Sequence, residues 1–466
     1  MARLTTFPIG GVHPDDSKIA RGCPIEALPL PQTVYISMAQ HLGAPAKPVV
    51  AVGDTVKVGQ VIAEPGGFIS AFIHSSVSGT VKSIGPRKDL AGNPVTHVEI
   101  TVEGDEWAEG IDLSDTLVKE IPTDRAAVLD KIKACGVVGL GGATFPTHVK
   151  LNPAPGCVAE CLIINGAECE PYLTSDFRLM LERSKEIVVG AAIMKMVLGE
   201  CRCVIAIEEN KPEAIDAMSS AVAALGFQGI EVLPLMKKYP QGGEKQLIAA
   251  VMGRQVKSGA LPISVGAVVQ NVTTAFAVYE AVQKNKPLIS NILTVTGDCL
   301  PATGLHNYLF RIGIPLSYIA EYAGGIPEGA AKIISGGPMM GKAIANLDAT
   351  TVKGSSSILY LSEAATRRKP ESNCIRCGRC ADACPMGLEP FLLRRLYNAG
   401  DCEGLEAQAV QDCIECGCCL YSCPANIPLL DNIRMAKGQV MGIIRARAAA
   451  AKAAAEAAKA KAAENK

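Results

Sequence analysis

The middle of the chain alternates between two hydrophobic patterns. Short continuous apolar runs, as in strands buried on both faces of a sheet, lie at residues 161–164, 204–207, 230–233 and 267–269. Longer segments with apolar residues at helical spacing lie at residues 125–135, 184–198, 211–225, 243–252 and 273–282. This alternation predicts a layered α/β domain, which we place at residues 106–290.

The regions on either side of this domain have the pattern of short strands. Residues 36–105 contain apolar stretches separated by glycine turns, with the spacing of a small all-β unit. Residues 291–350 return to strand-like runs around one expected helix near residues 316–322. Residues 1–35 are rich in proline and glycine, which predicts an extended arm laid on the body of the protein.

The C-terminal third contains two matching cysteine motifs. Each has three cysteines at every third position and a fourth directly before a proline. In two-cluster ferredoxins this spacing supplies three ligands to one [4Fe-4S] cluster and the fourth ligand to the other cluster. The predicted sets are Cys374, Cys377 and Cys380 with Cys423, and Cys413, Cys416 and Cys419 with Cys384.

Two other interpretations of these cysteines are zinc knuckles and structural thiols. Zinc normally takes four ligands in two pairs and has no use for two copies of a three-plus-one pattern. Cys418 stands next to Cys419 but breaks the spacing, so we leave it out of the ligand sets. Helical periodicity at residues 391–397, ended by Gly400, predicts a helix-rich ferredoxin domain over residues 351–440.

The last segment, residues 441–466, is rich in alanine and lysine. Alanine favours a helix, but the segment has no apolar stripe to pack against a partner. We therefore expect a marginal helix that forms a solvated or frayed tail. Attraction of its basic side chains to an anionic membrane surface is the alternative.

Composition narrows the classes of function. The formal net charge is −1, which gives no global attraction to phosphate backbones, and aromatic residues make up only 4% of the chain, which argues against a surface that stacks nucleic-acid bases. No apolar run reaches the roughly 18 residues of a membrane-spanning helix. The chain has 18 cysteines and shows no signal peptide, which together indicate a reducing, cytoplasmic compartment.

A glycine-rich loop in the α/β domain is the first candidate for ligand binding. Gly141 and Gly142 allow backbone N–H groups to approach a phosphate, and Lys150 can add a positive charge. Such loops also serve as plain tight turns. Three further polar strings lie at strand ends or helix starts, where α/β sheets bind ligands, at residues 165–171, 239–245 and 270–274. Each of these can instead be a cap or a turn.

The order of these motifs resembles the flavin-binding subunit of respiratory NADH dehydrogenases. The shared strings are Gly-Gly-x-x-Phe-Pro-Thr, Asn-x-x-Glu-x-Glu-Pro, Tyr-x-x-Gly-x-Glu and Asn-Val-x-Thr. Residues 36–105 resemble the barrel-sandwich hybrid of biotinyl and lipoyl domains, although no carrier lysine stands at the expected tip near residues 64–68. Residues 291–350 resemble the β-grasp module called SLBB.

With the two cysteine motifs added, residues 1–440 resemble the C subunit of the Rnf complex, the membrane-bound ferredoxin:NAD+ oxidoreductase of bacteria. The resemblance implies a Rossmann-like FMN domain, with cofactor contacts at Gly141, Gly142, Lys150, Asn165, Glu168 and Asn271. It implies that the residues facing NAD(H), in the catalytic position, are Phe145, Glu170 and Glu244.

The same resemblance implies a place in a larger assembly. The chain is expected at the cytoplasmic face of the bacterial membrane, as a peripheral subunit without a transmembrane segment of its own. Its partners would be the membrane and peripheral subunits of an Rnf-type complex, which couples electron flow to Na+ or H+ transport. A hydride donor delivers two electrons and a cluster accepts one, so the flavin would convert between them.

Two other functions stay open on the sequence. One is a cobalamin reductase of a bacterial microcompartment, which has the same build of flavin, clusters and β module. The other is an iron-sulfur relay or docking subunit without flavin chemistry. Three departures from the respiratory pattern make the second conceivable, namely Leu140, Ala167 and Gly243.

Overall fold

The computed structural model describes the backbone of residues 4–464 and the side chains of residues 4–455. The chain forms two compact units. Within the described residues, the larger unit comprises residues 4–7, 14–237 and 241–367, and the smaller unit comprises residues 8–13, 238–240 and 368–464.

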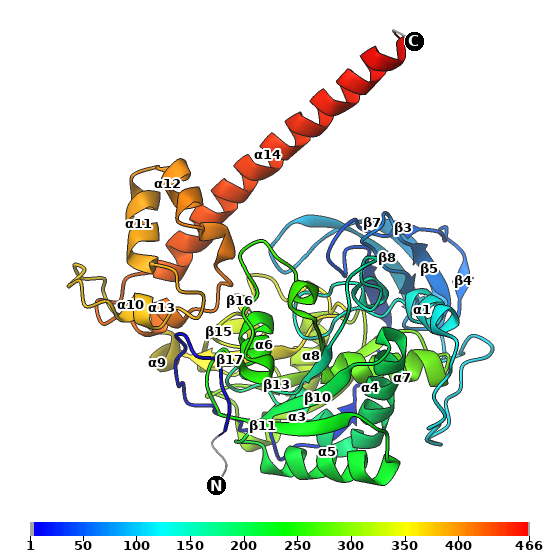
Figure 1. Cartoon of the computed structure of the whole chain (residues 1–466). Helices are drawn as coiled ribbons and strands as arrows, with labels where there is room; N and C mark the ends of the chain where they lie inside the picture. The colour runs from blue at the N-terminus through cyan, green and yellow to red at the C-terminus, as the bar shows by residue number, and fades with distance from the viewer. Residues whose placement is uncertain (1–3, 465–466) are drawn as a thin grey trace. The chain divides into compact units, whose positions relative to one another are not determined.

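The α/β domain of the larger unit is built on a four-stranded parallel sheet (Figure 1). Its strand order is β11-β10-β9-β12. The strands are β9 (Cys161–Asn165), β10 (Arg202–Glu208), β11 (Ile230–Leu235) and β12 (Ala267–Asn271). All four predicted strands are present. Strands β9, β10 and β12 are almost wholly buried, as their continuous apolar sequences indicate, whereas the edge strand β11 contains the exposed Glu231.

Helices cover both faces of this sheet. The hydrophobic cluster on one face contains residues of α1, α3, α4, α5 and α7, and the cluster on the other face contains residues of α6. The helices are α1 (Arg125–Ala134), α2 (Thr147–Lys150), α3 (Ser175–Glu182), α4 (Ser184–Leu198), α5 (Pro212–Leu225), α6 (Glu244–Met252) and α7 (Val272–Gln283), with a short 3-10 helix η1 (Pro262–Val265) before β12. The five predicted helices are confirmed, whereas α2 and α3 are additional.

The N-terminal β region forms two small sheets. One has the strand order β2-β8-β7-β4 and the other has the order β3-β5-β6. The strands are β2 (Thr33–Ser37), β3 (Lys47–Pro48), β4 (Thr55–Val56), β5 (Val61–Glu64), β6 (Ile73–His74), β7 (Gly79–Lys88) and β8 (Pro94–Val102). The prediction of a small all-β unit is correct.

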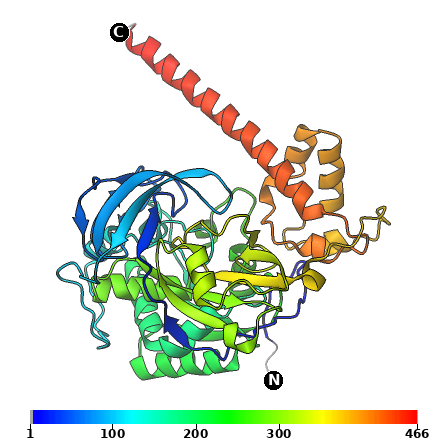
Figure 2. The ribbon, with the colours of Figure 1, turned by 180° about the vertical axis from the view of Figure 1, so that it is seen from behind.

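A six-stranded mixed sheet completes the larger unit (Figure 2). Its order is β1-β14-β13-β17-β15-β16. Its strands are β1 (Ile25–Ala27), β13 (Ser290–Thr296), β14 (His306–Arg311), β15 (Ala330–Ser335), β16 (Lys342–Ala343) and β17 (Ser357–Ser362). The helices of this region are α8 (Leu316–Tyr322), α9 (Glu363–Thr366) and the 3-10 helix η2 (Ala302–Gly304).

This sheet corrects two boundaries that we expected from the sequence. Strand β1 lies in the predicted arm and pairs in parallel with β14, so part of the extended arm forms the edge strand of this sheet. Strand β17 lies beyond residue 350, in the segment that we assigned to the ferredoxin domain, and it pairs with both β13 and β15. Burial of five of its six residues requires these two neighbours, and the larger unit accordingly continues to Arg367.

The smaller unit is mostly helical. Its helices are α10 (Arg379–Asp382), α11 (Pro390–Asn398), α12 (Cys402–Ala407), η3 (Val410–Asp412), α13 (Cys418–Tyr421) and α14 (Leu429–Glu464). Figure 1 shows α11 and α12 packed beside the first turns of α14. Two short segments from earlier in the chain join this unit, because Val12 and Tyr239 form an antiparallel bridge and Gly11 N donates to Ala383 O at 2.9 Å.

Helix α14 differs from the expected frayed tail. Its first half is anchored by buried Ile433, Ala436 and Val440, so the costly first turns of the helix are stabilised by packing. Each following alanine then adds one hydrogen bond at little entropic cost. The backbone stays helical to Glu464, while the side chains of residues 446–455 are exposed as expected.

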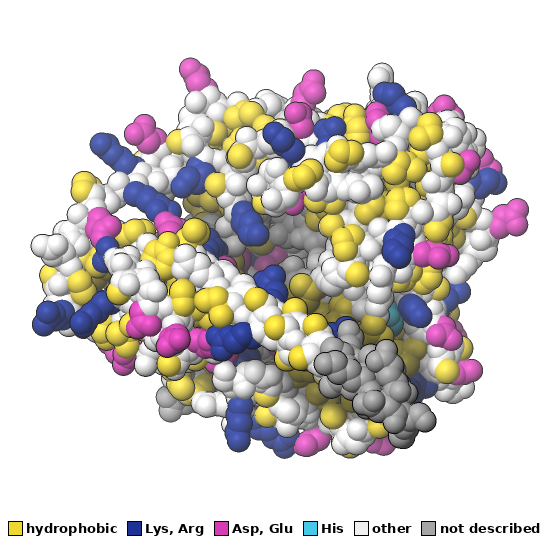
Figure 3. Space-filling view, turned by 90° about the horizontal axis from the view of Figure 1, so that it is seen from above, with side chains coloured by type: hydrophobic (Ala, Val, Ile, Leu, Met, Phe, Trp, Pro, Cys, Tyr) yellow, Lys and Arg dark blue, Asp and Glu magenta, His cyan; other side chains and the backbone are white. Residues whose placement is uncertain are grey.

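The surface agrees with the near-zero net charge. On the face shown in Figure 3, basic and acidic side chains are interspersed. Within the described residues, no helix has the length and apolar character needed to cross a membrane.

The contact between α4 and α7 allows a test of the core. A Cβ atom added at Gly190 would lie 1.9 Å from the backbone oxygen of Ala275, so Gly190→Ala must separate the two helices. We expect a loss of about 1–3 kcal/mol in the free energy of unfolding, as for other overpacked cores, measured by chemical denaturation.

The matched control is Gly438→Ala in α14, where an added Cβ meets no atom within 4 Å. This variant should be as stable as the wild type or slightly more stable, because alanine favours the helix. Equal stability of Gly190→Ala and the wild type would show that α4 and α7 do not approach this closely.

Candidate functional site

The candidate flavin site lies at the carboxyl ends of β9 and β12. These strands pair in parallel, and Asn165 and Asn271 are register partners at their last positions. The chain passes from β9 to β10 and β11 on one side and returns to β12 on the other side. The sheet therefore reverses its strand order beside β9, which is where open α/β sheets bind ligands.

The two asparagines connect the loops around this point. Asn165 Nδ2 donates to Gly242 O at 2.9 Å, which ties β9 to the start of α6. Asn271 caps α7, because its Oδ1 accepts from Thr273 N at 2.7 Å. Its Nδ2 donates to Asp176 Oδ2 at 2.7 Å, and Thr273 Oγ1 donates to the other oxygen of Asp176 at 2.7 Å. Asp176 of α3 was not among the predicted residues.

The glycine-rich loop closes over the start of α7. Leu140 N donates to Thr274 Oγ1 at 2.9 Å, and Gly139 N donates to Phe145 O at 2.8 Å. A Cβ added at Gly141 would stand 3.1 Å from the Cβ of Asn271, so any larger residue would press against the Asn271 side chain. Gly142 has a φ of 130°. Gly141 and Gly142 are both exposed, so their backbone is available to a ligand above the strand ends.

Lys150 and Glu244 form an ion pair. Lys150 Nζ lies 2.5 Å from Glu244 Oε1, and both side chains are partly exposed. The pair joins the end of α2 to the first residue of α6. The structure thus brings Lys150, which we predicted to lie near the phosphate, into contact with Glu244, which we predicted to face NAD(H).

Glu168 is buried beside this network. Its Oε1 accepts from Asp176 N at 2.8 Å. Its Oε2 lies 3.5 Å from Lys18 Nζ, but accepts no hydrogen bond from any group in the described part of the chain. Burial raises the pKa of Glu168 to about 7, with Lys18 and Lys211 opposing the rise and Asp176 adding to it.

Glu170 points toward the six-stranded sheet. Its carboxylate accepts from Met339 N at 3.1 Å and from Met340 N at 2.8 Å, in the turn between β15 and β16. An added Cβ at Gly337 would overlap this carboxylate. Glu170 therefore joins the loop after β9 to another domain. Phe145, the remaining predicted nicotinamide-side residue, has a half-buried side chain on the glycine-rich loop.

Two buried lysines near the site were not identified from the sequence. Lys18 donates to three backbone oxygens of the loop after β9, and Lys211 Nζ donates to Ala167 O at 2.6 Å. Burial lowers the pKa of Lys211. Neither lysine stands in a recognisable motif, so only the tertiary contacts reveal them.

These residues fit a flavin. The loop of Gly141 and Gly142 offers exposed backbone, and Glu168 Oε2 is a buried acceptor that has no donor among the described residues. A buried acceptor of this kind normally has a partner, which a bound ligand with N–H or O–H groups can supply.

The cysteine motifs of the smaller unit share one backbone conformation. Arg376 and Glu415, at equivalent positions, have φ values of 55° and 57°. Gly378 and Gly417, two residues later, have φ values of 78° and 79°, and each precedes a short helix, α10 or α13. The two motifs are therefore structural repeats.

Four of the predicted ligands lie near one another. Burial raises the pKa of Cys419, and the neighbouring thiols of Cys413, Cys416 and Cys384 raise it further. Burial also raises the pKa of Cys413 to about 11, again with contributions from Cys416 and Cys384. The fourth cysteine of the first motif thus lies among the first three of the second motif.

The other predicted set is more exposed. Cys380 and Cys423 are neighbours, because Cys423 adds to the rise that burial causes in the pKa of Cys380. Cys374 and Cys377 are exposed. No group of three or more His, Cys, Asp or Glu side chains in the described residues has the geometry of a single-ion site. A four-iron cluster binds each thiolate at a different iron, so its ligands stand farther apart than those of one ion.

Cys418, which we left out of the ligand sets, is fully buried. Its Sγ lies 3.9 Å from Tyr239 O, and a hydrogen bond with the Cys416 thiol raises its pKa. Cys418 is thus a buried thiol that packs beside the predicted ligand Cys416.

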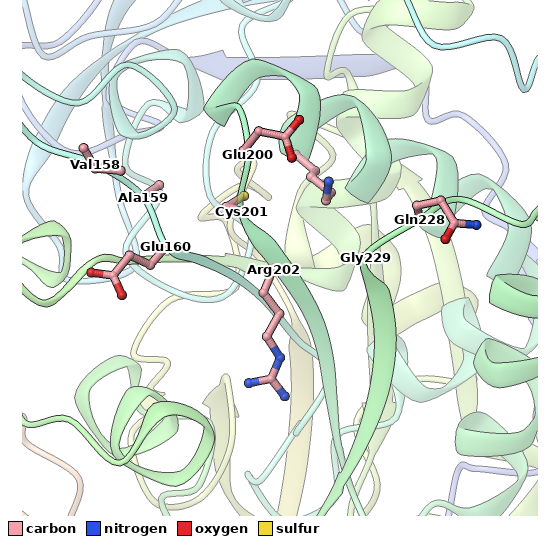
Figure 4. A pocket seen from close by; sticks show the side chains of 9 residues that line it. Val158, Ala159, Glu160, Glu200, Cys201, Arg202, Gln228 and Gly229 are labelled. Atoms are coloured by element: carbon pink, nitrogen blue, oxygen red, sulfur yellow. The ribbon is translucent and has the colours of Figure 1, made fainter.

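A cavity of about 440 Å³ lies at the opposite end of the α/β sheet (Figure 4). Glu160, Glu200 and Arg202 line it near the amino ends of β9 and β10. Glu160 is paired with Arg254 at 2.7 Å, and Arg202 is paired with Glu231. None of the predicted site residues lines this cavity.

Comparison with known families matches three parts of the chain. Residues 132–280 match the Nuo51 FMN-binding domain, and residues 6–106 match the RnfC barrel sandwich hybrid domain. Residues 369–388, which include the first cysteine motif, match a 4Fe-4S binding domain.

Curated relatives match most of the chain. The C subunit of the proton-translocating ferredoxin:NAD(+) oxidoreductase complex of Clostridium ljungdahlii is 47% identical over 388 residues, which is 82% of this chain and 83% of that protein. The C subunit of the Na(+)-translocating ferredoxin:NAD(+) oxidoreductase complex of Acetobacterium woodii is 41% identical over 439 residues, covering 93% and 96%.

Among solved structures, an NAD+-reducing [NiFe]-hydrogenase in the air-oxidized state aligns with a TM-score of 0.48 at 20% sequence identity. The alignment covers 68% of this chain and 65% of that one. A likeness of this size does not by itself establish a shared fold.

The ionisation of Glu168 makes stability depend on pH. The pKa is about 7 in the folded protein against 4.5 ordinarily, so the folded state holds the proton more tightly and loses stability as the pH rises from about 4.5 through 7. Glu168→Gln removes this loss. The stability of the variant relative to the wild type should therefore increase over this range, by up to about 3 kcal/mol in the free energy of unfolding.

Denaturant titrations at several pH values between 5 and 8 measure this difference. Glu328→Gln, which replaces an exposed glutamate, should show no such trend. A difference between Glu168→Gln and the wild type that stays constant across pH would mean that Glu168 ionises normally.

Proposed function

The chain belongs to the RnfC family, the C subunits of Rnf-type ion-translocating oxidoreductase complexes, and from this membership we propose that it exchanges electrons between NAD(H), FMN and two [4Fe-4S] clusters. The observation that carries the proposal is the presence, in one chain, of a flavin-type site at the strand ends and of a repeated cysteine motif. The names of the relatives support the same reaction class, ferredoxin:NAD+ oxidoreduction.

FMN, when bound, supplies the exchange between two-electron hydride chemistry and one-electron transfer. The residues of the chain would bind FMN and orient it. Gly141 and Gly142 present backbone N–H groups, while Asn165 and Asn271 hold the surrounding loops in register. Glu168 offers its Oε2 atom as a hydrogen-bond acceptor.

The three residues proposed to face NAD(H) make different contacts in the structure. Phe145 lies on the glycine-rich loop and can contribute an aromatic face. Glu244 is paired with Lys150 at the surface, and a phosphate that attracts Lys150 would compete for this pair. Glu170 already accepts two backbone N–H groups, so its part in nucleotide binding would be through the shape of the loop.

Two clusters are proposed, although the family match covers only the first cysteine motif. The repeated backbone of the two motifs supports a second cluster of the same type. The grouping of Cys384 with Cys413, Cys416 and Cys419 supports exchange of the fourth ligand between the motifs.

We further propose that the six-stranded sheet is an SLBB-type β-grasp module. The N-terminal β unit would have a docking or structural role and would not carry a swinging group.

The chain would be a peripheral subunit at the cytoplasmic face of the membrane, with membrane subunits of an Rnf-type complex as partners. Relatives are named for both H+ and Na+ translocation. The alternative of a microcompartment cobalamin reductase is favoured by no feature of the described structure.

Anaerobic purification of the chain tests the proposed function directly. We expect about eight irons per chain, the content of two four-iron clusters, together with extractable FMN. Addition of NADH should bleach the flavin absorbance. Eight irons with neither flavin nor bleaching would favour the relay or docking subunit without flavin chemistry.

The exchange of fourth ligands between the motifs gives a second test. The double variant Cys374→Ser/Cys377→Ser should lose one cluster and retain about four irons. Adding Cys423→Ser should then cause no further loss, because Cys423 would serve the cluster already lost. Adding Cys384→Ser instead should remove most of the remaining iron.

Iron analysis and the visible absorbance of the clusters provide the readout. Cys418→Ser is the control and should retain all the iron, since Cys418 is a neighbour and not a ligand. If each cluster used only one motif, the effects of the two added substitutions would be reversed.

A further inference from the structure

Lys18 contacts the proposed flavin site from outside the matched FMN-binding domain, which covers residues 132–280. Its ammonium group donates to three backbone oxygens of the loop after β9. The distances are 2.8 Å to Glu168 O, 2.9 Å to Glu170 O and 2.5 Å to Leu173 O. The Lys18 side chain is only 8% exposed. An ammonium group has three hydrogens, so all of them are used.

The shape of this loop explains why it needs a cation. Glu168 and Tyr172 have φ values of 41° and 71°, which are left-handed and uncommon for residues other than glycine. These turns direct several carbonyl oxygens to one buried point. Without Lys18, these buried oxygens would have neither its hydrogen bonds nor water in their place. The strained conformation of the loop would then no longer be stabilised.

Asp16 fixes the same arm segment at a second position. Its backbone oxygen accepts from Tyr172 N at 2.9 Å. Its carboxylate accepts from Asn210 Nδ2 at 3.0 Å and lies 3.6 Å from Lys237 Nζ. Residues 16–18 therefore hold the loop after β9 through both backbone and side-chain contacts.

The contacts of Lys18 leave Glu168 with an unused acceptor. Since the three Lys18 hydrogens bind carbonyl oxygens, Glu168 Oε2 receives the attraction of the charge at 3.5 Å but no hydrogen bond from the described residues. The other charged groups that face Glu168 are Asp176 of α3 and Lys211 at the start of α5, and Lys211 is itself paired with Glu208 at 3.4 Å. The Glu168 side chain is 4% exposed, so bulk water does not supply the missing donor.

We propose that Lys18 is a positioning residue of the flavin site, which holds the loop at residues 165–173 and keeps the Oε2 atom of Glu168 directed to bound FMN. This inference rests on the proposed function, because FMN is the ligand that the site would hold. The N-terminal arm would then contribute to flavin binding, although it lies outside the matched FMN-binding domain.

The test is a titration of flavin-depleted full-length protein with FMN, followed by flavin fluorescence over a range of pH. Lys18→Met should weaken FMN binding by about tenfold or more, as for the loss of an outer partner that orients a ligand group. The pH at which binding changes, expected near 7 in the wild type, should move upward in Lys18→Met because Glu168 loses its nearest positive charge. The same inflection should be absent from Glu168→Gln.

Lys237→Met is the matched control, since it removes another cation that pairs with the arm without touching the loop. It should bind FMN as the wild type does, with the same pH profile. If Lys18→Met matched this control in both affinity and pH profile, Lys18 would be a structural tie only and the inference would be wrong.

Hydrogen exchange separates this inference from the proposed function. In flavin-free protein, Lys18→Met should increase the exchange of backbone amides at residues 166–173, and Lys18→Arg should restore part of the protection. A wild type that bound no FMN would refute the proposed function, and unchanged exchange in Lys18→Met would refute the positioning role. Iron content reports on the smaller unit alone and should be the same in all these variants, and an unchanged far-UV circular dichroism spectrum should show that the larger unit is folded.

Discussion

The parallel register of β9 and β12 is the constraint on which the candidate site depends. It places Asn165 and Asn271 side by side at the ends of two neighbouring strands. One asparagine then binds the start of α6 through Gly242, and the other binds Asp176 at the start of α3. A shift of β9 by one residue in this register would turn Asn165 to the other face of the sheet and break its contact with Gly242.

The same constraint explains why the site is rich in buried charge. The loop after β9 must leave the sheet and cross toward α3 within a few residues, so its backbone cannot form regular hydrogen bonds. Lys18 and Lys211 donate to its oxygens, and the carboxyl groups of Glu168, Glu208 and Asp176 lie near these two cations. Buried charges of this kind are costly unless they are paired and hydrogen-bonded, which makes the network sensitive to the loss of any member.

The architecture of the α/β domain could be predicted from the sequence because its strands β9, β10 and β12 are largely buried and contain continuous apolar runs. The edge strand β11 is apolar except for the exposed Glu231, and the five helices between and around the strands have clear periodicity. The exceptions are elements without such a pattern. Strand β1 reads Ile-Glu-Ala and is stabilised by its pairing with β14, and α3 is separated from α4 by Arg183 alone.

The site could be predicted only where its residues stand in motifs. The glycine-rich loop and the two asparagines were found because strand ends and glycine turns are visible in the sequence. Lys18 and Asp176 were not found, because their roles come from tertiary contacts with residues about 95 to 155 positions away. The ion pair of Lys150 and Glu244 was missed for the same reason, although both residues were named.

The two cysteine sets differ in burial, and this difference bears on how they would act. Cys384, Cys416 and Cys419 are buried, whereas Cys374 and Cys377 are exposed. Solvent exposure, net charge and hydrogen bonds to sulfur all influence the reduction potential of an iron-sulfur cluster. Two clusters with identical ligand types would therefore have different potentials in this chain. If both sets hold clusters, the repeated backbone would make them alike in structure, and the unequal burial would give them different potentials.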